Sequence, residues 1–258
     1  MELDLYQVDA FTAKPFGGNP AAVVPLGDWL DDATLQAIAL ENNLSETAYF
    51  VRRNGRYDLR WFTPSIEVDL CGHATLASAY VITTWLDPKA ERIDFDSKSG
   101  PLAVTREGEM LTLDFPAKPP RPVEDRKVAA ALGFEPKELL RADKTLAVLD
   151  SEAAVRAVTP DLEVVAGLDS DGLIVTAPGE EVDFVSRYFA PHAGIPEDPV
   201  TGSAHCVLTP YWAARLGKDS LSAWQVSARG GELSCRLSGE RVLISGRVAP
   251  YLQGRITL

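Results

Sequence analysis

The sequence predicts an α+β protein made of two related halves. A short phrase occurs twice: DLRWFTP (58–64) is followed by CGHA (71–74), and DFVSRYFAP (183–191) is followed by TGSA (201–204). The two copies lie 127 to 130 residues apart in a chain of 258. Each copy leads into an almost uncharged helical stretch, and strand-like apolar runs stand on both sides of it. A helix that is apolar all round has to be buried, so we expect sheet to surround each helix.

The first half is predicted to consist of strands enclosing one buried helix. Strands are expected over 3–11, 21–24, 48–51, 57–62, 92–95, 102–105 and 110–115. A surface helix is expected over 32–43, because apolar residues recur there at helical spacing after two aspartates. The uncharged helix is expected over 73–86. It is too short to cross a membrane, which takes about 20 apolar residues, so its composition indicates burial in the protein.

Four prolines in PAKPPRP (116–122) predict a linker over 117–124, between lobes of residues 1–116 and 125–258. In the second lobe we expect helices over 127–132, 136–141 and 203–217, and strands over 145–149, 173–177 and 182–189. Pro210 should kink or break the last helix. Alternation from 225 to 258 predicts three or four more strands. The pattern leaves open whether these strands stay in the second lobe or cross to the first.

Composition excludes several classes of function. A net charge of −12 argues against binding to nucleic acid or to an anionic membrane. The cysteines, at 71, 206 and 235, are odd in number and form no CxxC pair, which indicates neither a disulfide framework nor a zinc ribbon. His192 and His205 lack ligand spacing, so no metal is expected. The acidic first ten residues do not resemble a signal peptide, and we expect a cytoplasmic protein.

The two glycine-led helices suggest where a ligand binds. The first N–H groups of a helix have no partners inside it and attract anions, by about 0.3–1 kcal/mol for each helix and up to ~2 kcal/mol when partly buried. Two such ends facing each other would hold a carboxylate between the lobes. The alternative is that an old duplication persists for folding alone. Polar residues at both helix starts favour a site.

Glu46 is the carboxylate that stands out, since it follows the turn Asn43-Leu-Ser and precedes a buried strand. It could act as a general base at carbon. The residues alone favour the alternative, a carboxylate at a helix end. His73 and Ser203 occupy matching positions after Gly72 and Gly202, where they could donate hydrogen bonds to a substrate. Equally, their side chains could form hydrogen bonds with backbone groups at the helix start.

Three further residues are candidates for weaker roles. Asp198 could bind a substrate amine or hydroxyl or orient His73, or it could simply form a turn before proline. Cys71 could be a thiolate at a helix N-terminus. Because Thr201 stands at the matching position, two facing thiols are excluded, and a small buried residue is the simpler interpretation. The turn FGGNP (16–20) lacks a phosphate-binding glycine pattern and should bring Asn19 near the cleft.

Four segments, in order along nearly the whole chain, resemble the PhzF-like isomerases of phenazine biosynthesis. The segments are DAFTAKPFGGNPAAVV (9–24), NLSETAYF (43–50), RWFTPSIEVDLCGHATLASAYV (60–81) and EDPVTGSAHCVLTPYWAARLG (197–217). The resemblance implies a diaminopimelate-epimerase-like fold, in which two pseudo-symmetric lobes each wrap a curved, mostly antiparallel sheet or barrel around a central helix. It also implies a site in the cleft between the lobes and a homodimer.

The resemblance further implies a cofactor-free isomerase in which Glu46 moves a proton between carbons of the substrate. Carried over by motif, Gly72, His73, Asp198, Gly202 and Ser203 become substrate contacts, with Asn19 beside them and with Cys71 and Thr201 in secondary roles. Related epimerases have Cys-Gly at both helix starts, whereas this chain has it only at the first. A shift using one base therefore fits better than a racemisation using two.

The resulting hypothesis is an isomerase that acts on a small carboxylate, amino-acid-like or cyclic. One alternative is an amino-acid racemase or epimerase that uses Cys71 together with Glu46. Another is a non-catalytic protein that binds small carboxylates in the same cleft.

Overall fold

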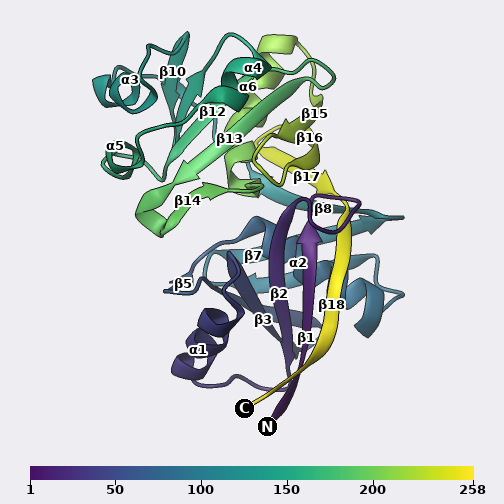
Figure 1. Cartoon of the computed structure of the whole chain (residues 1–258). Coiled ribbons are helices and arrows are strands. Elements are labelled where there is room, and N and C mark those ends of the chain that lie inside the picture. The colour runs from purple at the N-terminus through teal and green to yellow at the C-terminus, as the bar shows by residue number, and fades with distance from the viewer. The chain divides into compact units, whose positions relative to one another are not determined.

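The computed structural model describes all residues from Met1 to Leu258. They form two compact units, Met1–Asp114 together with Ser245–Leu258, and Phe115–Ile244. Both units combine mostly antiparallel strands with a few helices, which confirms the α+β class (Figure 1). The last strand belongs to the first unit, so the end of the chain does cross back to it. None of the helices has the length and apolar content needed to span a membrane.

The first unit is built on one continuous sheet. Its strands are β1 (Glu2–Ala10), β2 (Asn19–Leu26), β3 (Glu46–Arg53), β4 (Arg56–Phe62), β5 (Glu67–Val68), β6 (Arg92–Ser97), β7 (Gly100–Glu107), β8 (Met110–Pro116) and β18 (Val248–Thr257). Pairing runs β18–β1–β2–β3–β4–β6–β7–β8, with parallel pairs at β2–β3 and β4–β6. Figure 1 shows β18 alongside β1. The helix α1 (Asp32–Asn42) matches the predicted helix. Its N-cap is Asp31, whose side chain accepts from the Thr34 N–H.

The central helix of this unit is α2 (Gly72–Val81), and every one of its residues except Tyr80 is buried. It packs against β1, β2, β3, β7 and β18, as its lack of charge predicts. Its buried hydroxyls are satisfied locally, since Ser78 Oγ donates to the carbonyl of Ala74 at 2.8 Å. The helix continues into a π-helical turn, η1 (Ile82–Leu86), so the predicted stretch is helical throughout but changes its hydrogen bonding near the end.

The second unit holds more and shorter elements. Its strands are β9 (Arg121–Pro122), β10 (Glu138–Arg141), β11 (Thr145–Val148), β12 (Leu173–Pro178), β13 (Phe184–Ala190), β14 (Ile195–Asp198), β15 (Ser220–Gln225), β16 (Gly231–Ser238) and β17 (Arg241–Gly246). Its helices are α3 (Arg126–Leu132), α4 (Glu152–Ala157), α5 (Leu162–Ala166), α6 (Gly202–Leu216) and the 3-10 turn η2 (Pro191–Ala193). The helix α6 packs against β15 and β16. The proline-rich segment expected as a linker contributes β9, which pairs with β10.

One expectation about the second unit was wrong. Residues 136–141 do not form a helix, because residues 138–141 are the strand β10, paired with β9 and β11. Pairing on both sides outweighs the helical preference of Glu-Leu-Leu. Pro210 does not break α6. A proline cannot donate to the carbonyl four residues before it, Cys206, but that carbonyl accepts the Lys118 N–H at 2.9 Å instead, so no buried acceptor is left unsatisfied.

Candidate active site

Glu46 lies inside the first unit and not at a helix end. It is the first residue of β3, paired in parallel with Ala21 of β2, and it is only 7% exposed. Just before it, α1 ends at Asn43, which adopts a left-handed conformation with φ of 49°. This turn brings the chain directly from the helix into the sheet, so the carboxylate points into the protein.

His73 lies against this carboxylate. It is the second residue of α2, and its Nε2 atom is 3.1 Å from Oε2 of Glu46, with both residues buried. The two atoms are close enough for an ion pair, yet neither forms an aligned hydrogen bond with any group. A donor and an acceptor therefore sit side by side in the core with capacity left for a third atom.

The other ring nitrogen of His73 contacts two more side chains. Nδ1 lies 3.1 Å from Nδ2 of Asn19, the first residue of β2, and 3.5 Å from Sγ of Cys71. Cys71 is the N-cap of α2, with extended backbone and no side-chain capping bond. We call Asn19, Glu46, Cys71 and His73 the acid–imidazole cluster. All four were candidates in the sequence, and the fold brings them together from β2, β3 and the start of α2.

Burial and neighbouring charge shift the proton equilibria of this cluster. Burial lowers the pKa of His73, but Cys71 and Glu46 outweigh that effect and hold the pKa well above its usual range. Burial, reinforced by the Glu46 carboxylate, raises the pKa of the Cys71 thiol to about 11. Cys71 is therefore a protonated thiol near neutral pH, although a helix N-terminus would favour the thiolate.

The cluster contains ligand types that metals use, since one atom each from Glu46, Cys71 and His73 lies within 4.8 Å of the others. Cys71 and Glu46 contact opposite nitrogens of one imidazole ring. Glu46, Cys71 and His73 are therefore the residues that could hold a metal ion.

In the second unit, Asp198 and Thr201 contact each other at the start of α6. Thr201 is the N-cap, and its hydroxyl donates to Oδ2 of Asp198 at 2.5 Å. Gln225, at the end of β15, holds both residues in place, since it accepts the Thr201 N–H and donates to the Asp198 carbonyl, each at 2.8 Å. Sequence reasoning missed Gln225. The only signal was a single polar residue ending an alternating strand.

The two helix starts share a local construction. Gly72 and Gly202 are the first residues of α2 and α6. In each helix the residue four positions after the N-cap bonds the N-cap carbonyl: Thr75 through its hydroxyl at 2.6 Å, and His205 through Nδ1 at 2.8 Å. In neither helix does the side chain of the N-cap residue accept from a first-turn N–H group.

Ser203 follows Gly202 as the second residue of α6 and is half-buried. That the residues of both units serve one substrate stays a prediction.

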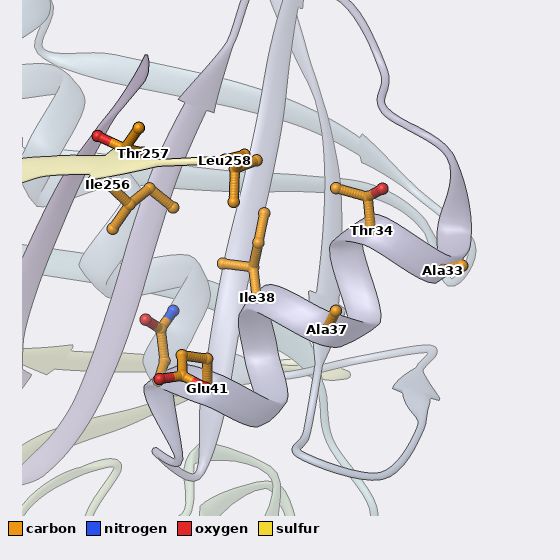
Figure 2. Close-up of a pocket in the computed structure, with 9 residues that line it drawn as sticks. Ala33, Thr34, Ala37, Ile38, Glu41, Ile256, Thr257 and Leu258 are labelled. Atoms are coloured by element: carbon orange, nitrogen blue, oxygen red, sulfur yellow. The ribbon is translucent and has the colours of Figure 1, made fainter. Parts of the chain in front are cut away.

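A separate hollow of about 630 Å³ opens in the first unit between α1 and the C-terminal end of the chain. Figure 2 shows Ile256 and Leu258 across from Ile38 of α1. The hollow is lined by Ala33, Thr34, Ala37, Ile38, Glu41, Asn42, Ile256, Thr257 and Leu258. None of the predicted site residues is among them, so the hollow is distinct from the acid–imidazole cluster.

Comparison with known proteins identifies the fold first and then the family. A predicted epimerase from Pseudomonas aeruginosa superposes with a TM-score of 0.77 over 99% of both chains, at 19% identity, which shows a shared fold. A PhzF-family phenazine biosynthesis protein from Enterococcus faecalis superposes with a TM-score of 0.97 at 48% identity, over the full length of both chains. An uncharacterized isomerase of P. aeruginosa is 54% identical over 259 residues, covering 100% of both chains.

Residues 8–254 match the phenazine biosynthesis-like protein family. The chain belongs to this PhzF family of isomerases, as the resemblance of its four segments implied.

Proposed function

We propose that this protein is a cofactor-independent isomerase that moves a proton between two carbons of a small carboxylate. Glu46 is the general acid and base. The observation that carries the proposal is the buried contact between Glu46 and His73, 3.1 Å apart, in which neither atom is fully bonded. A base at carbon needs a carboxylate shielded from water and a partner close by that can stabilise charge.

The proton shift balances without any added reagent. The Glu46 carboxylate takes a proton from one carbon, and the electron pair of that C–H bond moves into the conjugated system of the substrate. The double bond shifts as the carboxylic acid returns the proton to a second carbon. The carboxylate is regenerated, and neither oxidant nor reductant is consumed. His73, with Nε2 beside the same oxygen, would stabilise the negative charge that develops in between.

Binding of the substrate is proposed to use the glycine-led helix starts. Gly72 has no side chain to obstruct the first N–H groups of α2, which attract a carboxylate. Asp198, Gly202 and Ser203 are proposed as further polar contacts. Family membership supports these roles, because they rest on motifs that run through the matched region. We also propose, on the same resemblance, a cytoplasmic homodimer.

The test is hydrogen exchange with solvent. Candidate carboxylates are incubated in deuterated water, and incorporation at carbon is followed by NMR for the wild type and for Glu46→Gln. We expect incorporation to fall by about 10²–10⁴-fold, the usual contribution of a positioned acid or base. Glu41→Gln, an exposed glutamate on α1, is the matched control and should retain full exchange. Undiminished exchange in Glu46→Gln would remove Glu46 from its role.

A second candidate is an amino-acid racemase or epimerase in which Cys71 acts together with Glu46; the Cys71 sulfur and a Glu46 oxygen lie within 4.8 Å of each other. The pKa of about 11 opposes this role, because a protonated thiol is a poor base. Cys71→Ala separates the two candidates, since it abolishes a two-base racemisation and spares a shift that uses Glu46 alone. Carboxylate binding without exchange would indicate a non-catalytic protein.

A further inference from the structure

The contacts around His73 differ in kind on the two sides of its ring. On the Nδ1 side stand Nδ2 of Asn19 at 3.1 Å and Sγ of Cys71 at 3.5 Å. An amide NH₂ group can only donate, and a protonated thiol is a weak donor. On the Nε2 side stands the Glu46 carboxylate at 3.1 Å, which can only accept when ionised. Donors thus face one nitrogen and an acceptor faces the other.

An imidazole ring in such surroundings has one favoured neutral form. Nδ1 carries the lone pair, because it accepts from Asn19, and Nε2 carries the proton, because it faces a carboxylate. We propose that Asn19 is a positioning residue that fixes this tautomer whenever the ring is neutral, so that Nε2 keeps its proton beside the Glu46 carboxylate in both charge states of His73. This inference rests on the proposed function of the Glu46–His73 pair, and it gives Asn19 a role other than the substrate contact expected from the sequence.

Position and burial support this role for Asn19. It is fully buried at the first residue of β2, where its neighbour in β1 is Ala10, so its backbone is held by the sheet. The titratable groups facing the ring are Glu46 from β3 and Cys71 from the start of α2. Glu46 draws a second proton toward the ring, whereas the Asn19 N–H disfavours a proton on Nδ1.

His205 has the opposite tautomer and serves as an internal reference. Its Nδ1 donates to the carbonyl of Thr201 at 2.8 Å, so the proton of this neutral ring is on Nδ1. Burial lowers the pKa of His205 to about 4, which keeps the ring neutral through the usual pH range. The remaining histidine, His192, is exposed and should exchange between both tautomers. The three histidines should therefore be distinguishable in one spectrum.

The experiment is a long-range ¹H–¹⁵N correlation spectrum of the full chain labelled with ¹⁵N-histidine, recorded at increasing pH. This spectrum shows which nitrogen of each ring carries a proton. In the wild type we expect the neutral ring of His73 to keep its proton on Nε2, opposite to His205. A neutral His73 ring with its proton on Nδ1 would overturn the proposal. A ring that keeps both protons up to the highest pH at which the protein stays folded would overturn it too.

A matched pair of variants completes the test. Asn19→Asp keeps the shape of the side chain but replaces the donor by an acceptor, so His73 should become protonated on Nδ1. Asn54→Asp adds the same charge at an exposed turn and should leave the His73 signals unchanged. Identical His73 signals in the wild type and in folded Asn19→Asp would overturn the proposal. Should Asn19→Asp not fold, the wild-type spectrum still decides.

The result does not depend on activity. A wild-type tautomer other than the expected one would remove Asn19 from its role and leave the exchange test of Glu46 standing. Conversely, if the exchange test showed that Glu46 is not the base, the proton would still be expected on the same nitrogen of the His73 ring.

Discussion

The buried contact between Glu46 and His73 is costly for stability and is explained best by chemistry. Moving a carboxylate and an imidazole out of water incurs a desolvation penalty. Their mutual attraction offsets this penalty only when the geometry is good. Here the two atoms are close but not aligned as a hydrogen bond. Two apolar residues of similar volume would fill the same space without that penalty. Such groups are typical of sites where proton transfer has to be shielded from solvent.

The three cysteines of this chain should be unreactive while the protein is folded. Burial raises the pKa of Cys71 to about 11 and those of Cys206 and Cys235 to about 12. Since the thiolate is the reactive form, we expect the native protein at pH 8 to react with Ellman's reagent at least about a hundredfold more slowly than the urea-unfolded chain.

The same measurement bears on the role of Cys71. A single fast-reacting thiol in the native protein, lost in Cys71→Ala, would contradict the prediction and would support the racemase alternative. Cys235→Ala is the control, because it removes a buried thiol of the second unit and should leave such a fast phase intact.

The helix α2 holds His73 of the acid–imidazole cluster in place because the sheet of the first unit encloses it. Its sequence of small and apolar residues lets the strands approach on all sides, so the position of His73 is set by packing. A helix held in this way is rigid, and side chains on rigid elements keep catalytic geometry better than side chains on loops.

Truncation of a buried side chain in α2 should therefore destabilise the protein strongly. Leu76 is fully buried, and we expect Leu76→Ala to lower the free energy of unfolding by about 2–5 kcal/mol, from lost burial and the cavity left behind. Leu86→Ala, in the π-turn that continues the same helix, removes a side chain that is 44% exposed and should cost less than about 1 kcal/mol. Urea denaturation measures both. Equal losses would show that α2 is not the enclosed element described above.

At the scale of the whole chain, the end of the sequence completes the unit in which it begins. The strand β18 pairs antiparallel with β1 along nearly its entire length, from Glu2 opposite Thr257 to Ala10 opposite Val248. The amino group of Met1 donates to the carbonyl of Leu258 at 2.6 Å. The first unit therefore cannot complete its sheet until the last residues have been made.

Removal of residues 248–258 should destabilise the first unit specifically. Without β18, the strand β1 keeps only β2 as a neighbour, and its outward N–H and C=O groups become exposed. We expect hydrogen–deuterium exchange to accelerate in peptides that cover β1, and to change less in peptides that cover β12 and β13. Deletion of Leu258 alone is the control. Full protection of β1 in the longer truncation would contradict the prediction.

The sequence alone determined much of this protein. Periodicity and charge located most strands, α1 and the uncharged helices, because these patterns depend on local backbone preferences and on which face is buried. The four linked motifs identified the family, which the comparisons confirm. They also selected Glu46, His73, Asn19 and Cys71, although they gave no distances between them.

Only the tertiary structure decided the rest. Strand β10 forms because β9 and β11 pair with it, α6 continues through Pro210 because Lys118 satisfies a freed carbonyl, and β18 joins β1 from the far end of the chain. The same holds for the site: Glu46 is opposed to one nitrogen of His73 and Asn19 to the other only after β2, β3 and α2 have packed. Apart from β11, which follows β10 directly, these partners are distant in sequence, and local patterns carry no information about contacts that long-range packing creates.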